Sequence, residues 1–572
     1  MAALAQFDWL LAIITIAFCF SAFGNGANDV ANSYATSVAA RTLTMIQVGF
    51  LSIITEFVGA VALGARVTST IKNGIITIDR FEDRPGVLIL AMTCAEVGSA
   101  TWLMVATRLG MPVSTTQTIV GALVGVGFAS QSPIKWAWQS GSVSQVAASW
   151  GIAPLISGAM AAVIFATIKY FVLDRQNPLK NALRLIPFYL AFTAAMLALF
   201  IVVEAPTAPS LEEFGAGKGC GIVLGVFFGI LAIAYIFFMP YFTRRLIKGD
   251  ARLRWYHIPL GPILRKENPY LYFPGDANGD VVIDHYESAH RKTELAEFPV
   301  LKPRNEKILA DTPPTDIGVS EELNLGPVDP EQNILPPAPK DKRSMEPQER
   351  FLSPTSHLHL YHPQRLWSWT KFIVMQGVTR DCVSHESKSL AKTHMRAVHY
   401  DNRVEHLWTY PQVASAMLMS IAHGSNDVAN AVGPWSAAYS SYEAGEVATK
   451  SPTPVWILVV AGLLLGLGFW VFGYHITRSL GNKITQLSPT RGFSMELGAA
   501  ITVLLASRLG LPISTTQCLT GATVGVALMN YDLGAVNWRQ VLFIFSGWVV
   551  TLPIAGLISG ILMVMALNAP HF

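Results

Sequence analysis

Charged residues are scarce in this sequence. Asp, Glu, Lys and Arg make up only 14% of its 572 residues, whereas a soluble domain usually carries about 25%. The net charge of +3 provides no strongly basic surface, so we expect no nucleic-acid partner. The cysteines are scattered and odd in number, which argues against a disulfide framework and a cysteine metal cluster: Cys19, Cys94, Cys220, Cys382 and Cys518.

Signatures of common enzymes are missing as well. The sequence contains no HExxH zinc site, no nucleotide-binding loop and no evident pairing of a nucleophile with a base. Each of these patterns would point to a catalytic class. We therefore expect neither enzymatic activity nor an organic cofactor.

Apolar runs fill most of the chain, of which 51% is hydrophobic. Many runs approach the roughly 20 residues that a helix needs to cross a bilayer. Only helices and closed barrels satisfy their backbone in lipid, and the ~10-residue alternation of barrel strands is missing. The predicted fold class is an all-α polytopic membrane protein with about 12 membrane elements. These elements lie near 9–36, 45–65, 86–108, 112–130, 145–170, 183–204, 219–243, 410–437, 455–476, 492–508, 512–529 and 539–566.

A polar insert divides the runs into two groups. We expect an N-terminal membrane half at 1–243, a cytosolic insert at 244–408 and a C-terminal membrane half at 409–572. Residues 298–354 are rich in proline and charged residues and cannot form a hydrophobic core, which predicts disorder there. Helical apolar spacing returns at 366–408, where we expect helices on the membrane surface or against the bundle.

Basic residues predict the orientation in the membrane. They gather near the span ends of three connections: Lys169, Arg175, Lys180, Arg184, Arg244, Arg245, Lys248, Arg252, Arg254, Arg478, Lys483 and Arg491. Because cytoplasmic loops carry an excess of Lys and Arg, we place these connections in the cytosol and both termini outside. Residues 1–8 contain neither Lys nor Arg, which does not fit a cleaved secretory signal.

The second half of the chain repeats motifs of the first. Residues 96–126 return at 496–526 with 17 of 31 positions identical, and GANDVANS at 26–33 returns as GSNDVANA at 424–431. The matches include polar residues, and the spacing between the motifs is nearly the same in both halves, so we infer a duplication. An odd number of crossings separates equivalent motifs. The halves therefore form inverted repeats, a plan of secondary transporters with a site near the midplane.

The repeated N-D-x-x-N motif places a carboxylate inside an apolar run without a nearby Lys or Arg. Such a group needs a partner helix, a proton or a bound cation to offset its burial. Hard oxygen ligands suit Na⁺, and Gly24 and Gly26 are expected to let the helix unwind and release carbonyl ligands. The alternative to a cation site is that these polar residues only form hydrogen bonds between helices. The predicted sodium ligands are Asn28, Asp29, Asn32, Asn426, Asp427 and Asn430.

The second motif, P-[VI]-S-T-T-Q, predicts an anion site. Proline starts a fresh helix, and the free N–H groups and dipole of a helix N-terminus attract anions. The preceding helix ends within a few residues, so we expect a re-entrant or broken hairpin in each half, with its tip at the midplane. Ordinary helix caps are the alternative. The predicted ligands are Ser114, Thr115, Thr116, Gln117, Ser514, Thr515, Thr516 and Gln517.

Three glutamates lie within apolar stretches: Glu56, Glu96 and Glu496. Glu96 and Glu496 occupy equivalent repeat positions. The glutamates are candidates for cation ligands, proton sites or partners of Arg108 and Arg508; the alternative for Glu96 is a position near a span end without a role in transport.

Together these motifs resemble the inorganic phosphate transporter (PiT) family, the sodium- or proton-coupled phosphate permeases. The resemblance covers roughly 9–240 and 366–566, and the long insert is similar to that of fungal sodium-coupled permeases of the plasma membrane. It implies that the N-D motifs form the cation and phosphate site, that the S-T-T hairpins bind phosphate and that the three glutamates serve transport.

The resulting hypothesis is a symporter. Sodium would supply the positive charge that the motifs lack, so that each ligand favours binding of the other, and rocking of the two halves would expose the site alternately. Proton coupling, another oxyanion such as sulfate, a channel and a phosphate sensor remain open. Expected partners are inorganic phosphate, sodium as the only metal, and the bilayer; a homodimer is left open.

Overall fold

The computed structural model describes residues 4–64, 75–138, 142–204, 215–265, 281–286, 345–383, 388–447 and 453–569, together with residues 68, 71, 273, 274 and 276. Across these ranges the protein is helical, apart from one antiparallel bridge between Ile76 and Ile134. Eight helical segments there are long and apolar enough to span a bilayer: Ala5–Ala39, Met45–Leu63, Pro85–Arg108, Val143–Leu173, Pro178–Val203, Ala216–Ile247, Val455–Phe472 and Trp538–Leu567.

The helices follow the order of the predicted runs. The first half contains α1 (Asp8–Asp29), α2 (Ala31–Ala39), α3 (Met45–Leu63), α5 (Pro85–Arg108), α6 (Thr115–Ala129), α7 (Val143–Ile168), α8 (Pro178–Glu204) and α10 (Ala216–Ile233). α11 (Met239–Phe242) closes the first half, and the insert contributes α12 (Gly261–Leu264), α14 (Pro347–Phe351), α15 (Pro363–Met375) and α16 (Lys388–Arg396). The second half contains α17 (Asn402–Ala444), α18 (Val455–Phe472), α19 (Tyr474–Leu480), α20 (Pro489–Arg508), α21 (Thr515–Leu528) and α22 (Trp538–Leu567).

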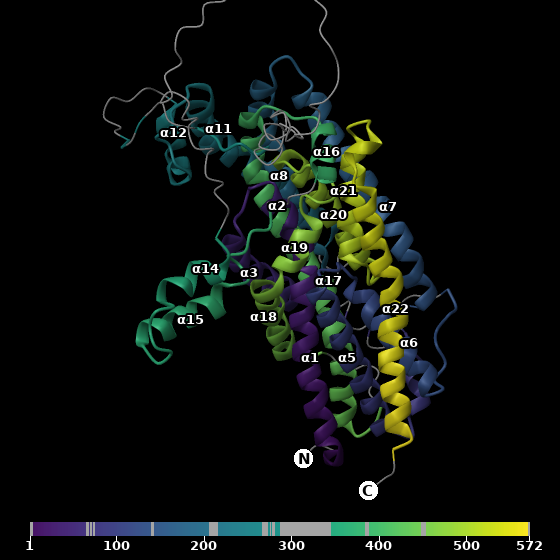
Figure 1. The fold of residues 1–572 in the computed structure, drawn as a ribbon. Helices are drawn as coiled ribbons and strands as arrows, with labels where there is room; N and C mark the ends of the chain where they lie inside the picture. Colours follow the sequence, from purple (N-terminus) through teal and green to yellow (C-terminus); the bar gives the residue numbers. More distant parts are fainter. Residues whose placement is uncertain are drawn as a thin grey trace, which may run out of the picture.

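Figure 1 shows a bundle whose N- and C-terminal ends lie together at one end, while α11, α12 and α16 lie at the opposite end. This arrangement agrees with an odd number of crossings between the two halves. We refer below to the end that holds α16 as the insert end of the bundle.

Local sequence explains where several helices begin. Thr44 precedes α3, and its side chain accepts a hydrogen bond from Gln47 N while Gln47 bonds back to the Thr44 N–H, which is a capping box. Pro85 and Pro489 stand in the first turns of α5 and α20, where proline costs no backbone bond. Gly445 adopts a left-handed conformation (φ +78°) and ends α17.

The glycines of the N-D motifs serve packing rather than unwinding, contrary to the sequence-based expectation. α17 runs unbroken through Gly424 over its 43 residues, and the break between α1 and α2 falls at Val30, after Asp29. A Cβ on Gly26 would lie 1.8 Å from the Leu465 carbonyl oxygen. Glycine is therefore needed because two helices touch backbone to backbone.

The two halves interleave. α6 packs on α22 and α21 packs on α7, so each hairpin helix lies against a long helix of the other half. Glycines line both crossings: a Cβ on Gly125 would lie 2.0 Å from the Gly556 carbonyl oxygen, and one on Gly525 would lie 2.3 Å from that of Gly158. The G-x-x-x-G spacing in α6 and α21 permits this close approach.

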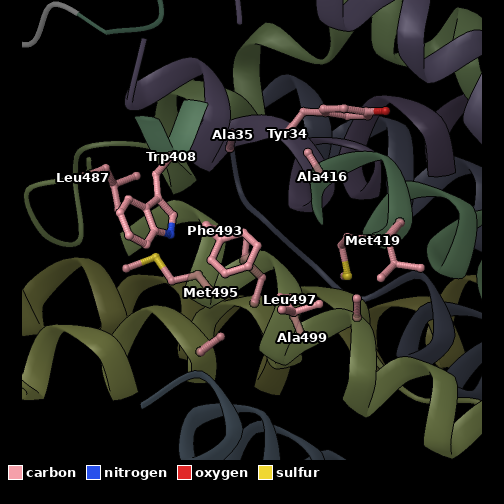
Figure 2. Packing of buried hydrophobic residues seen from close by; sticks show 14 of the residues in the cluster. Tyr34, Ala35, Trp408, Ala416, Met419, Leu487, Phe493, Met495, Leu497 and Ala499 are labelled. Atoms are coloured by element: carbon pink, nitrogen blue, oxygen red, sulfur yellow. The ribbon is translucent and has the colours of Figure 1, made fainter. Parts of the chain in front are cut away.

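Aromatic and aliphatic side chains fill the space between α2, α17 and α20. Figure 2 shows the Trp408 ring beside Met495 and Phe493, and the Tyr189 ring of α8 packs 5.8 Å from the Trp408 ring and 5.7 Å from the Phe493 ring. Burial of such large side chains contributes strongly to packing. This core holds α2 against the second half of the chain.

The insert differs in part from its prediction. Of the stretch predicted to be disordered, residues 298–344 lie outside the described residues, while α14 gives residues 347–351 a helical structure. Helices occur as expected within 366–408: α15 is exposed, and α16 buries Leu390 and His394 against the bundle. α17 begins at Asn402, before the predicted start of the second membrane half.

Candidate functional site

Two helical hairpins bring their tips together inside the bundle. Helices α6 and α21 have only 15 and 14 residues, which at 1.5 Å per residue is about 22 Å and too short for a crossing. Thr116 donates a hydrogen bond of 3.2 Å to the Ile513 carbonyl, and Thr516 can donate one of 3.1 Å to the Val113 carbonyl. The two tips therefore contact each other directly.

Serine has a capping role at both tips. Ser114 Oγ accepts from Gln117 N at 3.2 Å, and Ser514 Oγ accepts from Gln517 N at 3.3 Å. These bonds match the helix-cap alternative. Because a serine hydroxyl can still donate its own hydrogen, capping leaves each Ser able to bind an acceptor such as an oxyanion.

The Asp29 carboxylate lies between the two hairpins. Its Oδ2 accepts bonds from the backbone N and Oγ1 of Thr115, at 3.2 and 2.7 Å, and its Oδ1 accepts one from Thr516 Oγ1 at 3.0 Å. In the second half, Asp427 Oδ2 accepts a bond of 2.9 Å from Thr515 Oγ1. The repeat is thus preserved in three dimensions.

His423 also belongs to the site, although it was not among the residues predicted from the sequence. Its Nδ1 lies 2.7 Å from Glu56 Oε2, and its Nε2 lies 3.1 Å from Asp427 Oδ2, with all three side chains buried. Ser420 donates a further bond of 2.5 Å to Glu56 Oε1. A signal was available, because His423 lies in an apolar run one helical turn before Asp427 and Asn25 occupies its repeat position.

The second asparagine of each motif reaches the opposite hairpin. Asn32 Nδ2 donates to Thr516 at 2.8 Å, and Asn430 Nδ2 donates to Thr115 at 3.0 Å. Four amide oxygens around these tips are buried without a donor among the described residues: those of Asn32, Asn430, Gln117 and Gln517. Buried acceptors without donors are the ligands a cation requires.

The first asparagines connect each N-D motif to its own hairpin. Asn28 Nδ2 donates to Thr107 Oγ1 at 3.0 Å, and Asn28 Oδ1 accepts from Val113 N at 3.1 Å. The amide of Asn426 lies 3.3 Å from Ser507 Oγ, the equivalent position. Both asparagines therefore fix the hairpin turns as well as offering oxygen atoms.

The site is closed to solvent in this conformation. All fourteen predicted sodium and phosphate ligands are at most 3% exposed. One ligand atom from each of Asp29, His423 and Asp427 lies within 4.8 Å of the others. Two buried carboxylates at such separation repel each other unless a positive charge lies between them.

The remaining glutamates lie outside this cluster. Glu496 Oε1 accepts bonds from Thr36 at 2.6 Å and Ser37 at 2.7 Å, and its Oε2 accepts one from Ser415 at 2.6 Å. Gln412 donates to Glu496 as well. Its repeat equivalent, Glu96, is fully buried near the Ser21 hydroxyl and lacks a comparable set of donors among the described residues. The duplicated glutamates have therefore diverged in their surroundings.

Comparison with known proteins agrees with this geometry. Residues 25–559 match the model of the phosphate transporter family. The chain belongs to the phosphate transporter family. It is 39% identical to the phosphate-repressible phosphate permease pho-4 of Neurospora crassa, over 100% of this chain and 99% of that protein. It is 30% identical to sodium-dependent phosphate transporter 1-B of Danio rerio, over 98% and 96% of the two chains.

A solved structure titled "The sodium-dependent phosphate transporter" shares the fold. Its TM-score is 0.63 at 24% identity, and the match covers 98% of this chain and 100% of that one. The predictions of a polytopic helical membrane protein, of the PiT family and of a transporter rather than an enzyme are confirmed. This member of the family is a phosphate transporter, and the roles of individual residues stay predictions.

Proposed function

We propose that this protein imports inorganic phosphate together with sodium across the plasma membrane by alternating access. One observation carries the coupling: Asp29 and Asp427 meet at two helix N-termini, and no Lys or Arg side chain contacts either carboxylate within the described residues. A phosphate anion added to two carboxylates needs compensating cations, since burial of unpaired charge is costly.

Phosphate and sodium would use different groups of this site. The first-turn N–H groups of α6 and α21 have no intrahelical carbonyl acceptor. Those of Gln117, Gln517 and Thr115 bond to side chains here, and the remaining ones, with the hydroxyls of Ser114 and Ser514, provide donors for phosphate oxygens. The Asp carboxylates and the donor-free oxygens of Asn32 and Asn430 provide sodium ligands. The Thr115 hydroxyl now donates to Asp29, so a bound cation on Asp29 would release this hydroxyl for phosphate.

The relatives support this assignment to different extents. The Danio rerio protein is named sodium-dependent, whereas the Neurospora crassa permease is named only for phosphate. The His423 bridge between Glu56 and Asp427 favours proton coupling as the second candidate, because these three groups can exchange a proton without crossing lipid. The same uptake experiment separates the two.

Radiolabelled phosphate uptake into liposomes that hold the purified protein tests the proposal. An inward sodium gradient is compared with an inward proton gradient at fixed voltage, for the wild type, Asp29→Asn, Asp427→Asn and the control Asp83→Asn on an exposed turn. We expect uptake with sodium alone, lost in both site variants and kept in the control. Uptake driven by protons alone would instead assign the coupling role to the glutamates. Replacing labelled phosphate with labelled sulfate tests which anion is the substrate.

A further inference from the structure

A basic cavity of about 420 Å³ lies between α14 and the start of α3, and none of its lining residues belongs to the site described above. It is bounded by the loop after α2, the start of α3, the end of α14 and the segment 378–383. Its chemistry is set by six of its lining residues: Arg41, Met45, Ile46, Arg350, Arg380 and Asp381. Figure 1 shows α14 beside α3 at this place.

Positive charge exceeds negative charge in the cavity. Three arginines face one aspartate in the lining. The nearby Glu346 carboxylate is shared, since it lies 3.8 Å from Arg380 and 3.7 Å from Arg478. The Arg380 guanidinium stacks 4.5 Å from the Tyr474 ring centroid, and its buried Nε has no acceptor among the described residues. A planar guanidinium fixed in this way presents its donors in a set direction.

The start of α3 adds to this field. α3 has 19 residues and begins at Met45, which together with Ile46 lines the cavity. Its capping box uses the N–H of Gln47, and its dipole places partial positive charge at this end. A helix N-terminus beside arginines is a favourable environment for a phosphate group.

The cavity also contacts the helix that carries part of the transport site. Val38 lines it at the end of α2, and the same helix places Asn32 against Thr516 and Thr36 against Glu496. Arg41, just beyond, holds a left-handed backbone (φ +60°) that non-glycine residues adopt rarely. A ligand bound here would therefore contact the far end of α2.

We propose that this cavity is a second phosphate-group site, which takes either free inorganic phosphate or the phosphorylated headgroup of a membrane lipid. Guanidinium groups pair with phosphate oxygens through two parallel hydrogen bonds, and this recognition is common to both sources. The adjoining helix α15 exposes Trp367, at 59%, and Ile373, at 60%, which suits contact with the bilayer interface beside the cavity. Occupancy would stabilise the α2 position seen here.

Equilibrium binding of radiolabelled inorganic phosphate to the detergent-purified full chain tests the first source. We expect the wild type to bind a second equivalent that the Arg350→Gln/Arg380→Gln double variant binds about tenfold more weakly, because charge-assisted hydrogen bonds are lost. The first equivalent, at the transport site, should remain. The matched control Arg365→Gln lies on α15 outside the lining.

Reconstitution tests the lipid source. Uptake is compared in vesicles of phosphatidylcholine alone and in vesicles with added phosphatidylinositol 4-phosphate. A rate that changes with this lipid in the wild type and Arg365→Gln, but not in the double variant, assigns the site to a headgroup. Arg350→Gln alone replaces the double variant if the latter does not give a folded monodisperse protein. A chain that shows neither a second phosphate equivalent nor a lipid effect, or that keeps either one in the variant, overturns the proposal.

Discussion

Thr516 donates a hydrogen bond of 3.0 Å to Asp29, although 487 residues separate them. The same hydroxyl lies 3.1 Å from the Val113 carbonyl, so it can bond to either acceptor but not to both at once. This threonine therefore links a carboxylate of the first half with the hairpin tips of both halves. Its donor is available to change partners when ligands enter or leave.

Replacement of Thr516 by valine should reduce sodium-driven phosphate uptake about tenfold, since a hydrogen bond to a charged group is worth about 1.5–3 kcal/mol. The measurement is the initial uptake rate in proteoliposomes as a function of phosphate concentration. Thr523→Val is the matched control, because within the described part of the chain Thr523 donates only to the Leu519 carbonyl of its own helix. Equal losses in both variants would mean that Thr516 acts through helix packing alone.

The His423 bridge predicts strong coupling between His423 and Glu56. His423→Gln removes the imidazole that bridges two buried carboxylates, and removal of one member of a buried pair costs about 3–5 kcal/mol. We expect a lower unfolding temperature in detergent and a loss of uptake. The double variant Glu56→Gln/His423→Gln should unfold at a higher temperature than His423→Gln, and strictly additive effects in this cycle would contradict a direct interaction.

The two repeat glutamates should respond differently to amidation. Glu496→Gln replaces one acceptor oxygen by an NH₂ group in a cage where Thr36, Ser37, Gln412 and Ser415 all donate, and a mismatched buried donor costs about 1–3 kcal/mol. Glu96→Gln breaks no comparable set of bonds. Thermal unfolding of both variants should therefore show the larger loss for Glu496→Gln; similar losses would argue that the cage does not stabilise the fold.

Acid stability of the insert end should depend on Asp250. Hydrogen bonds from Arg252, at 2.8 and 3.0 Å, and from Arg244, at 3.2 Å, hold the pKa of Asp250 below its usual range. A folded-state pKa below the unfolded one of about 3.9 gives stability at higher pH that is lost as pH falls through the folded value. The difference in unfolding temperature between the wild type and Asp250→Asn should therefore shrink on acidification. Asp83→Asn, on an exposed turn, is the control.

Much of the fold followed from the sequence because the membrane limits the options. The span positions, the helical class, the hairpins and the family depended on apolar length and on motifs repeated at nearly constant spacing. Whether the helices unwind at the glycines before the N-D motifs could not be predicted from the sequence. Gly24 and Gly26 suit unwinding as well as close packing, and only the backbone contact of Gly26 with Leu465 distinguishes the two.

The site was predicted less completely than the fold. The repeated residues of the two motifs lie together, but their binding roles stay predictions. The repeat does not mark His423, because Asn25 and not a second histidine occupies the equivalent position in the first half. The cage around Glu496 uses Thr36 and Gln412, whose partners come from distant helices, and no local pattern indicates such pairings.

The exchange of hairpin helices between the halves has a mechanical consequence. α6 packs on α22 and α21 packs on α7 through glycine-lined backbone contacts. A movement of residues 1–243 as one rigid body against residues 409–572 would therefore break both helix contacts. The bodies that move against each other must then each contain segments of both repeats. Duplication produced two similar sets of helices, but each moving body combines helices from both repeats, so neither repeat forms a functional unit by itself.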